Sequence, residues 1–425
     1  MAIGSRGDVQ PYVALSLGLQ DVGYEVTIAA HPAFEDFIRR FKIRFHAVTP
    51  GPDTLSVLKV DKGVRRVESF FRRLKAVPTI KQLILKMGAD CLDASQGTDA
   101  IIYSLPSLLF GPSIGEKLKL PAIPTCISAP MTPTRTHPFI YFGFKKKLGS
   151  SLNVLSWFII ESLFIVPFQW RVNQLRTELL NLPPTSITTR YSKLFAKQQT
   201  RTLVAISPNF LPKPPDWGNN IIMTGYWYLD TPRDFEPPRE LDTFLNSGTP
   251  PVYIGYGSMI AGDPKETLEL ILQALSITKQ RGIVECGGGL LLVGSPDNLL
   301  TIGSVPHDWL FPRMAAVVHH GGAGTTATGI RAGVPSVAVP FILDQPFWGR
   351  RLADLGVGTE PIPYRKLSVQ RLANAISRAV SDQGMREKAA RLGSLIRSED
   401  GVNKAVGALN HIFSDESKIL QNVLG

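Results

Sequence analysis

Residues 315–350 constrain the fold more than any other part of the chain. An apolar run ends in two histidines, and four small residues and two threonines follow before a helical pattern begins. A strand, a turn of small residues and a helix start form an anion site in that order. The backbone can approach a phosphate closely, and the helix N-terminus presents free N–H groups. The residues predicted to line this site are His319, His320, Gly321, Gly322, Ala323, Gly324 and Thr325.

A second polar pair follows one βα unit later. Asp344 and Gln345 come after the apolar stretch 336–340. Parallel strands end at a common edge, and ligands of open α/β sheets bind there. A carboxylate beside an amide can accept from and donate to sugar hydroxyls. We therefore expect one segment to offer donors for a diphosphate and the next to read a sugar. The alternative that Asp344 caps the helix expected over 346–355 stays open.

These segments resemble a known signature. HHGGAGTT, AGVPSVAVPF and DQPFWG match the donor-binding signature of family 1 glycosyltransferases in order and spacing. The likeness is greatest to the sterol glucosyltransferases and related bacterial and fungal enzymes that glycosylate hydrophobic natural products. It implies an α/β protein of the GT-B fold, with two Rossmann-like doubly wound domains facing a central cleft. It also implies UDP-glucose as co-substrate, with no cofactor and no metal, because the turn and the helix N-terminus replace a cation.

Length and proline content predict the domain organisation. A chain of 425 residues exceeds one typical core. Prolines cluster between 208 and 238, where they interrupt both helices and strands. We expect a first domain over 1–212, a linker over 213–238 and a second domain over 239–425. The resemblance implies that the first domain binds the acceptor and the second the nucleotide sugar, with the last helices packing back on the first domain.

Apolar runs alternate with helical patterns in both halves, which predicts parallel sheets built from βαβ units. The first helix is expected over 13–22. The strands are expected over 25–30, 100–103, 122–127, 221–224, 252–256, 282–285, 299–303, 316–319 and 335–340.

The N-terminal sequence GSRGDVQP, residues 4–11, lies where a first strand would give way to a first helix. It resembles a signature of the same glycosyltransferase group. The resemblance makes Asp8 the general base on the acceptor side and places Ser5 near the donor. A carboxylate suits this role, because an acceptor hydroxyl must lose a proton as the glycosidic bond forms. Asp8 could also be the N-cap of the first helix, and the two roles are compatible.

The first strand is unusually short in the sequence. Only Met1, Ala2 and Ile3 precede Gly4, whereas a strand usually has five or six residues. Three explanations are open: the start codon was assigned too late, the chain is truncated, or the sheet tolerates a first strand of three residues. We expect a longer native N-terminus, since a short strand would lose ladder bonds beside Asp8.

Two further motifs are assigned to the donor. Gly257 and Ser258 follow the strand expected at 252–256 and resemble the family's GSM loop near the phosphates. His307 and Trp309 belong to VPHDWLFP, which borders the nucleoside base in relatives. The plainer alternatives are a βα turn capped by Ser258 and a core position for Trp309. His307 lacks a histidine partner at metal-ligand spacing, so it is not expected to bind metal.

The adjacent histidines point to opposite faces at a strand end, so one alone can face the phosphate directly. The resemblance favours His319 for that position. His320 is then expected beneath it or toward the acceptor.

The loop MTPTRTHP resembles a border of the acceptor pocket in this group. It assigns Thr134, Arg135 and His137 to the acceptor. Sterol enzymes commonly have tryptophan before the Thr-Arg pair, and Pro133 stands there instead. This difference keeps a polyketide or macrolide acceptor open.

Charge and hydropathy point to a surface partner. Residues 1–212 hold 26 Lys and Arg against 14 Asp and Glu, and residues 213–425 hold 20 against 21. The apolar segment 152–169 could nearly span a bilayer, but Glu161 and Pro167 argue against a span. Basic residues at 145–147 and 171 flank it, and a second basic-aromatic patch covers 65–75. We expect an interfacial helix on an anionic membrane, the alternative being a buried helix.

Other classes are excluded by what the sequence lacks. No zinc-finger spacing or RNA-recognition motif is present, so no nucleic-acid partner is expected. Cys91, Cys126 and Cys286 are odd in number and form no CxxC pair, which favours a reducing compartment. With no signal peptide recognised, a cytoplasmic protein, peripheral on membranes, is expected.

Together the motifs predict an inverting glycosyltransferase that moves glucose from UDP-glucose to the hydroxyl of a sterol or similar hydrophobic alcohol. A secondary-metabolite glycosyltransferase and a nucleotide-sugar-binding protein without turnover are the alternatives.

Overall fold

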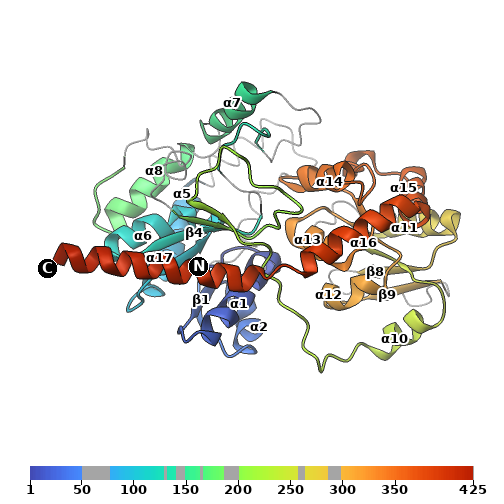
Figure 1. The fold of residues 1–425 in the computed structure, drawn as a ribbon, viewed down its shortest axis with the longest axis horizontal. Coiled ribbons are helices and arrows are strands. Elements are labelled where there is room, and N and C mark those ends of the chain that lie inside the picture. The colour runs from blue at the N-terminus through green and yellow to red at the C-terminus, as the bar shows by residue number, and fades with distance from the viewer. Residues whose placement is uncertain are drawn as a thin grey trace.

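The computed structural model describes residues 1–49, 77–128, 132–139, 149–162, 166–185, 201–256, 264–285 and 298–424. Two groups of parallel strands, each with its own helices, lie toward opposite sides of Figure 1. The sequence predictions at 65–75, 145–147, Gly257, Ser258 and Cys286 lie outside the described residues.

The second group is built on a five-stranded sheet in which all neighbours are parallel. Its strand order is β11-β10-β7-β8-β9. The winding therefore reverses between β7 and β10, and ligands of doubly wound sheets bind at this point. The strands are β7 (Val252–Gly255), β8 (Gly282–Glu285), β9 (Leu299–Ile302), β10 (Ala316–His319) and β11 (Ser336–Ala338).

The first group contains a four-stranded parallel sheet in the order β3-β4-β5-β6, and a separate parallel pair. The sheet strands are β3 (Ile101–Ser104), β4 (Ala122–Cys126), β5 (Thr202–Val204) and β6 (Ile221–Met223), and the pair is β1 (Thr27–Ala30) with β2 (Arg44–Ala47).

Residues 1–3 connect the pair to the sheet. The Met1 ammonium donates to the Ile102 carbonyl at 2.7 Å, and the Ser104 N–H donates to the Met1 carbonyl at 3.0 Å. On the other side, the Ala2 N–H donates to the Ala29 carbonyl at 2.9 Å. The short segment thus lies between β1 and β3 at the point where the winding of the first group reverses. Gly4 and the residues after it follow at that edge.

Helices cover both faces of the sheets. In the first group they are α1 (Arg6–Asp21), α2 (Glu35–Arg39), α5 (Val77–Asp93), α6 (Gly111–Leu118), α7 (Ser150–Ile160) and α8 (Val166–Gln174). In the second they are α10 (Arg239–Asn246), α11 (Pro264–Thr278), α12 (His307–Leu310), α13 (Ala323–Ala332), α14 (Gln345–Asp354), α15 (Val369–Ser381) and α16 (Gln383–Arg397).

The strands of the second sheet are buried on both faces. Val252 and Ile254 pack into one apolar cluster, whereas Tyr253 and Ile283 pack into another. Burial on both faces explains why these strands are continuous apolar runs instead of alternating patterns.

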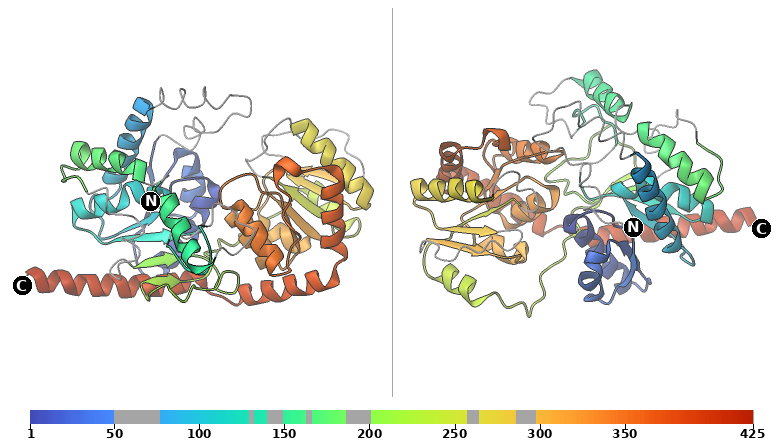
Figure 2. Two further views of the ribbon diagram at one scale, coloured as in Figure 1. Left: turned by 90° about the horizontal axis from the view of Figure 1, so that it is seen from above. Right: turned by 180° about the vertical axis from the view of Figure 1, so that it is seen from behind.

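The last helix, α17 (Gly401–Leu424), returns to the first group and packs on α1. Figures 1 and 2 show it running along that group from the end of α16. Val402 fits against Gly18, where an added Cβ would lie 2.5 Å from a Val402 methyl. The Tyr24 hydroxyl donates to Asn410 at 2.8 Å. Apolar side chains of α17 therefore complete the core of the first group.

Four elements differ from the sequence prediction in their bounds, their place or their presence. Helix α1 begins at Arg6, well before 13, because the helix continues through Pro11. Strand β6 lies inside the predicted linker and pairs with β5, so the first sheet extends beyond 212. Strands β2 and β5 were not predicted, since Arg44 and His46 interrupt one and the other has three residues. The domain limits themselves remain a prediction.

The first residue of α17, Gly401, has no room for a side chain. A Cβ at Gly401 would lie 2.2 Å from the Tyr226 carbonyl and 2.8 Å from the Gly225 backbone. Gly401→Ala is expected to destabilise the protein by about 1–3 kcal/mol, because backbone must move. Gly407→Ala, where a Cβ meets nothing within 4 Å, is the matched control and should stabilise by about 0.5–1 kcal/mol. Urea unfolding measures both; equal effects of the two substitutions would contradict the close crossing.

Candidate active site

Asp8 lies at the N-terminus of α1, where the first group reverses its winding. Ser5 is the N-cap residue, and Asp8 is the third residue of the helix. The Ser5 N–H and hydroxyl donate to Oδ2 of Asp8 at 2.7 and 2.8 Å. Asp8 is therefore not the N-cap that the sequence left open. It is the acidic partner in a capping arrangement, and Ser5 holds its carboxylate.

Two carboxylates from different sheets lie near one another. Burial raises the pKa of Asp8, and the Ser5 hydrogen bonds oppose this only in part. Burial also raises the pKa of Asp344, the Trp348 indole N–H lowers it, and the charge of Asp8 raises it further. Since the charge of Asp8 acts on Asp344, the starts of α1 and α14 lie within electrostatic range of one another. Neighbouring carboxylates with raised pKa values are typical of sites that transfer protons.

His319, the last residue of β10, is fully buried. Its Nδ1 accepts a hydrogen bond from the Gly321 N–H at 3.1 Å, so the proton of the neutral ring is on Nε2. Burial, with the charges of His320 and His307, lowers the pKa of His319 to about 3. The ring is therefore neutral at pH 7, and its Nε2 has no partner among the described residues.

His320 is only partly buried and lies against Gly322, where an added Cβ would be 2.3 Å from its Nε2. Burial and the charge of His307 lower its pKa to about 4, so this ring is neutral too. The sequence prediction gave His319 direct contact with a phosphate. The burial of the two rings favours His320 for that contact and a supporting position for His319.

The turn after the histidines leaves the start of α13 open. Gly322 is the N-cap residue and has no side chain to occupy the free N–H groups of the first turn. Gly321 has a φ of +81° and its Cβ position lies 3.0 Å from the Gln345 carbonyl, so only glycine fits there. An added Cβ at Gly324 would meet nothing within 4 Å. This geometry can accept an anion at the helix N-terminus.

Asp344 and Gln345 differ in availability. Asp344 precedes α14, but its side chain does not cap the helix; Oδ2 accepts a hydrogen bond from the Trp348 indole at 2.7 Å. Gln345 is buried, and its Oε1 accepts the backbone N–H groups of Phe341 and Ile342 at 2.8 and 3.1 Å. The amide oxygen of Gln345 is thus engaged in holding the loop, which makes Asp344 the better candidate for a sugar hydroxyl.

A polar cluster beside the histidines was not found from the sequence. Nε2 of His307 lies 2.9 Å from Oε2 of Glu285 and 3.0 Å from the Tyr253 hydroxyl, which itself donates to Glu285. Burial acts to raise the pKa of Glu285. The His307 and Tyr253 hydrogen bonds and the charges of His307 and Arg6 hold it below its usual value. Glu285 is the last residue of β8, and a carboxylate at the end of a predicted strand was the signal by which the sequence could have identified it.

The rings of His307 and Trp309 pack against other side chains of the second group, and their contacts with a nucleoside base stay a prediction. The His307 ring stacks on Phe311, with centroids 4.4 Å apart. The Arg313 guanidinium lies 4.1 Å from the Trp309 ring, and Phe235 packs edge-on at 5.6 Å.

Arg6 links the two groups at this site. Its Nη1 lies 3.4 Å from the Ser304 hydroxyl, which follows β9, and its guanidinium lies 5.1 Å from the Phe37 ring. The side chain of Arg6 is exposed. Through this hydrogen bond to Ser304, Arg6 connects the GSRGDVQP motif to the second group.

The described part of the loop that the sequence assigns to the acceptor, residues 132–138, is held by Asp216. Thr134 is buried and donates to Asp216 at 2.7 Å, and the Arg135 N–H donates to the same carboxylate at 2.7 Å. The Thr134 hydroxyl is thus engaged within the protein, and its contact with an acceptor stays a prediction. The Arg135 side chain is exposed. Asp216 was missed because it lies some 80 residues away in sequence.

His137 lies between the two groups. Its ring is 6.1 Å from that of Trp157 in α7 and 5.8 Å from that of Phe347 in α14. Nδ1 contacts the Pro138 carbonyl at 3.1 Å, and the buried Nε2 has no partner among the described residues. Burial lowers the pKa of His137, so a neutral ring faces the start of α14.

Among the described residues, no group of three or more His, Cys, Asp or Glu side chains could hold a metal ion. None of the helices in the described part of the chain has both the length and the apolar character needed to cross a membrane.

Two family descriptions match the chain. Residues 1–138 match the glycosyltransferase family 28 N-terminal domain, and residues 284–409 match the erythromycin biosynthesis protein CIII-like C-terminal domain. Two sterol 3-beta-glucosyltransferases of Arabidopsis thaliana are 36% and 34% identical over 100% and 98% of this chain. The chain belongs to the sterol 3-beta-glucosyltransferase-like group of glycosyltransferases.

The chain spans only part of its relatives. It covers 66% and 68% of the two Arabidopsis proteins. It covers 29% of the sterol 3-beta-glucosyltransferase of Yarrowia lipolytica, which is 36% identical.

Solved structures confirm the predicted fold. The kitacinnamycin glycosyltransferase matches with a TM-score of 0.69 at 16% identity, covering 96% of this chain and 97% of that one. The calicheamicin glycosyltransferase CalG4 matches with a TM-score of 0.67 at 18% identity, covering 96% of both chains. The protein has the GT-B fold, with two Rossmann-like α/β domains.

The lowered pKa values of about 3 and 4 at His319 and His320 have a measurable consequence. Between pH 6.5 and 4 the unfolded chain binds protons at these rings and the folded chain does not, so the free energy of unfolding should fall as the pH drops. The His319→Asn/His320→Asn variant should lose less than wild type between pH 7 and 5, by on the order of 4 kcal/mol, about 2 kcal/mol from each histidine.

Urea unfolding at several pH values gives this difference. The variant His411→Asn, exposed on α17, is the control and should follow wild type. Parallel curves for wild type and the double variant would contradict neutral buried histidines.

Proposed function

We propose that this chain transfers glucose from UDP-glucose to the hydroxyl of a sterol or similar hydrophobic alcohol. The observation that carries the proposal is the meeting of two strand-end sites from different sheets. Asp8 comes from the point where the first sheet reverses its winding. His320, the start of α13 and Asp344 come from the matching edge of the second sheet. A base and an anion site on opposite sides of one space suit group transfer from a nucleoside diphosphate sugar.

Asp8 is the proposed general base. Both Ser5 hydrogen bonds go to Oδ2, and no donor in the described residues is bonded to Oδ1. Ser5 therefore fixes the carboxylate while Oδ1 takes the proton of the acceptor hydroxyl. Burial raises the pKa of Asp8, which makes the carboxylate a stronger base than an exposed aspartate. The capping interaction and the catalytic role use different oxygens of one side chain.

The second sheet would stabilise the leaving group. The acceptor oxygen bonds to the anomeric carbon as the bond from that carbon to the diphosphate oxygen breaks, and the departing diphosphate gains negative charge. N–H groups at the start of α13 and the neutral His320 ring can donate to it. This single displacement inverts the anomeric configuration and needs no covalent intermediate. His319 supports the turn through the Gly321 N–H.

The choice of donor and acceptor rests on the relatives. Those covering the whole chain are named sterol 3-beta-glucosyltransferases, which supports glucose and a sterol. Two observations favour a secondary-metabolite acceptor as the second candidate. Pro133 stands where sterol enzymes commonly have tryptophan, and the fold matches glycosyltransferases of kitacinnamycin and calicheamicin. A structural neighbour at 21% identity is complexed with thymidine diphosphate, so TDP donors belong in the test.

Sterols reside in membranes, and we include an anionic membrane surface among the proposed partners. The positive charge of the chain, +11 overall at pH 7, supports this partner.

The function is tested by incubating the chain with labelled UDP-glucose or TDP-glucose and a panel of sterols and polyketide alcohols. A labelled sterol glucoside and equimolar UDP are expected. Labelled polyketide glycoside alone would support the second candidate. Binding of UDP without product from any acceptor would leave a binding protein without turnover and overturn the proposal.

Asp8→Asn separates the base from the fold. It should lower kcat by about 10²–10⁴-fold and leave the Kd for UDP within about twofold. Because the folded pKa of Asp8 is raised above 3.8, its ionised form costs stability at pH 7. The variant should therefore unfold at the same or a higher temperature, with the gain shrinking as the pH falls through that pKa.

Asp21→Asn, exposed at the end of α1, is the matched control and should keep full activity. An Asp8→Asn protein with wild-type kcat would remove Asp8 from the mechanism.

Asp344→Ala tests recognition of the sugar. Losing one hydrogen bond to a charged group of about 1.5–3 kcal/mol should lower kcat/KM for UDP-glucose by about 10- to 150-fold. The Kd for UDP, which lacks the sugar, should not change. Asp354→Ala, at the other end of α14 in a surface ion pair with Arg350, is the control. Equal losses for UDP and UDP-glucose binding would show that Asp344 acts on the loop and not on the sugar.

A further inference from the structure

Helix α7 buries two polar residues and, beside the buried Trp157, leaves three aliphatic residues exposed. Asn153 and Ser156 are buried. Leu152, Leu155 and Ile159 are 53%, 48% and 47% exposed. The three exposed residues are spaced three and four apart, so they form one stripe along the helix. Packing among the described residues gives no reason for an 11-residue helix to turn leucine and isoleucine outward.

The buried polar residues of α7 have a clear task, which is to hold the acceptor loop. The Asn153 amide donates to the Arg135 carbonyl at 2.8 Å, and the Phe139 N–H donates to the Ser156 hydroxyl at 2.8 Å. The Trp157 indole N–H donates to the His137 carbonyl at 3.3 Å. Since the inner face is engaged in this way, rotation of the helix to bury its leucines would break these bonds.

Helix α8 adds an exposed aromatic residue to the same part of the chain. Trp170 is 52% exposed, with the Arg171 guanidinium 3.7 Å from its ring. Its neighbour Gln169 is buried and donates to the Thr185 hydroxyl at 2.6 Å.

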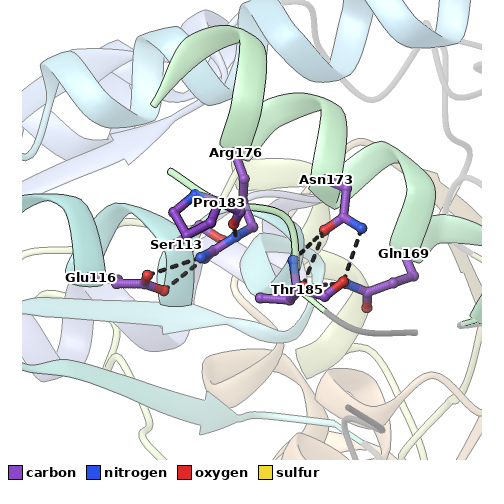
Figure 3. Close-up of polar contacts among 7 residues, drawn as sticks. All are labelled: Ser113, Glu116, Gln169, Asn173, Arg176, Pro183 and Thr185. Carbon is purple, nitrogen blue, oxygen red and sulfur yellow. Dashed lines mark hydrogen bonds and ion pairs between the residues drawn. The ribbon is translucent and has the colours of Figure 1, made fainter. Parts of the chain in front are cut away.

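Figure 3 shows how this helix is fixed to the body of the first group. Asn173, near the end of α8, exchanges hydrogen bonds with the backbone of Thr185. Arg176, in the helical turn Leu175–Leu179 that follows α8, forms a paired contact with Glu116 of α6 at 2.7 and 2.9 Å. Arg176 also donates to the Pro183 carbonyl. Trp170 is therefore presented outward by a rigid support.

We propose that the stripe of Leu152, Leu155 and Ile159, with Trp170, docks on an anionic lipid bilayer and inserts into its interfacial layer. Figures 1 and 2 show α7 at the outer edge of the molecule, where a flat surface can reach it. Leucine and isoleucine enter the acyl boundary, and tryptophan prefers the headgroup level.

Charge favours a bilayer as the occupant. Residues 1–212, which include α7 and α8, hold 26 Lys and Arg against 14 Asp and Glu. An excess of positive charge is attracted to anionic headgroups, and this attraction adds to a small apolar contact. A second copy of the chain would repel through the same charge. A stripe of three aliphatic side chains is also small beside the 1,200–2,000 Å² that stable protein interfaces usually bury, about 800 Å² from each partner.

The docking surface deepens the proposed function and rests on it. The loop that α7 holds continues to His137, whose ring lies 5.8 Å from Phe347 near the start of α14. Asp344 precedes that helix. A bilayer bound at α7 would therefore lie next to this loop, with the donor site on the loop's other side. A sterol would then enter the site from the membrane without crossing water.

Vesicle flotation with the full chain tests the proposal. Wild type is expected to float with vesicles containing phosphatidylserine and to stay behind with neutral phosphatidylcholine vesicles. Leu152→Ser/Leu155→Ser/Ile159→Ser should lower partitioning onto the anionic vesicles at least tenfold. Ile277→Ser/Leu395→Ser is the matched control, because these residues are 55% and 44% exposed on α11 and α16, and it should bind as wild type does.

Any of three results would overturn the docking surface. The first is failure of wild type to float with anionic vesicles, and the second is flotation of the α7 variant as complete as that of the control. The third is a wild-type dimer in sedimentation that the α7 variant loses. Turnover of a short, water-soluble alcohol without vesicles should be equal in wild type and the α7 variant. If wild type turns over this alcohol but does not bind vesicles, the proposed glycosyltransferase function stands and only the docking surface is refuted.

Discussion

Parallel strands place all of their carboxyl ends at one edge of a sheet, and the whole candidate site depends on this constraint. In the second sheet the winding reverses between β7 and β10, so among the described elements the crossovers after these two strands lead away from one another on either side of His319 and His320. In the first group the backbone bonds of Met1 and Ala2 place residues 1–3 between β1 and β3, at the corresponding point. Asp8 therefore lies near the second sheet because of strand order, and Arg6 reaches Ser304 for the same reason.

The ionisation states at the two edges are complementary. His319 and His320 are neutral because burial makes the imidazolium unfavourable, and the rings can donate without carrying their own positive charge. Asp8 and Asp344 are carboxylates whose pKa values burial raises. The ionised Glu285 is held by His307, Tyr253 and the charge of Arg6, all close to the histidines. Low dielectric, and not an unusual side chain, accounts for most of these shifts.

Much of the fold could be predicted from the sequence, because buried parallel strands are conspicuous. The ranges of β8 and β10 coincide with their apolar runs, which end where a glycine-rich turn or a polar residue begins. The start of α1 could not be predicted in this way, since Gly4 and Gly7 conceal a helix that continues through Pro11. Strand β5 has three residues, too few for a period to be visible.

The site was predictable at the level of motifs and less so at the level of single side chains. HHGGAGTT led to the turn proposed as the anion site, but the greater burial of His319 than of His320 is a property of the folded chain. Thr134 belonged to a suggestive loop, yet Asp216 engages it from outside that loop. Glu285 becomes a site candidate because Tyr253 and His307 contact its carboxylate, and these three residues come together only in the folded chain.

The return of α17 has a consequence for recombination between relatives. Val406, Leu409 and Ile412 of this helix belong to the apolar cluster that includes Val13 and Leu19 of α1. A chimera that joins the first half of one relative to the second half of another would thus pair a foreign helix with α1. Hybrids that exchange nucleotide specificity should retain the recipient's own C-terminal helix, with the second junction in the turn between α16 and α17.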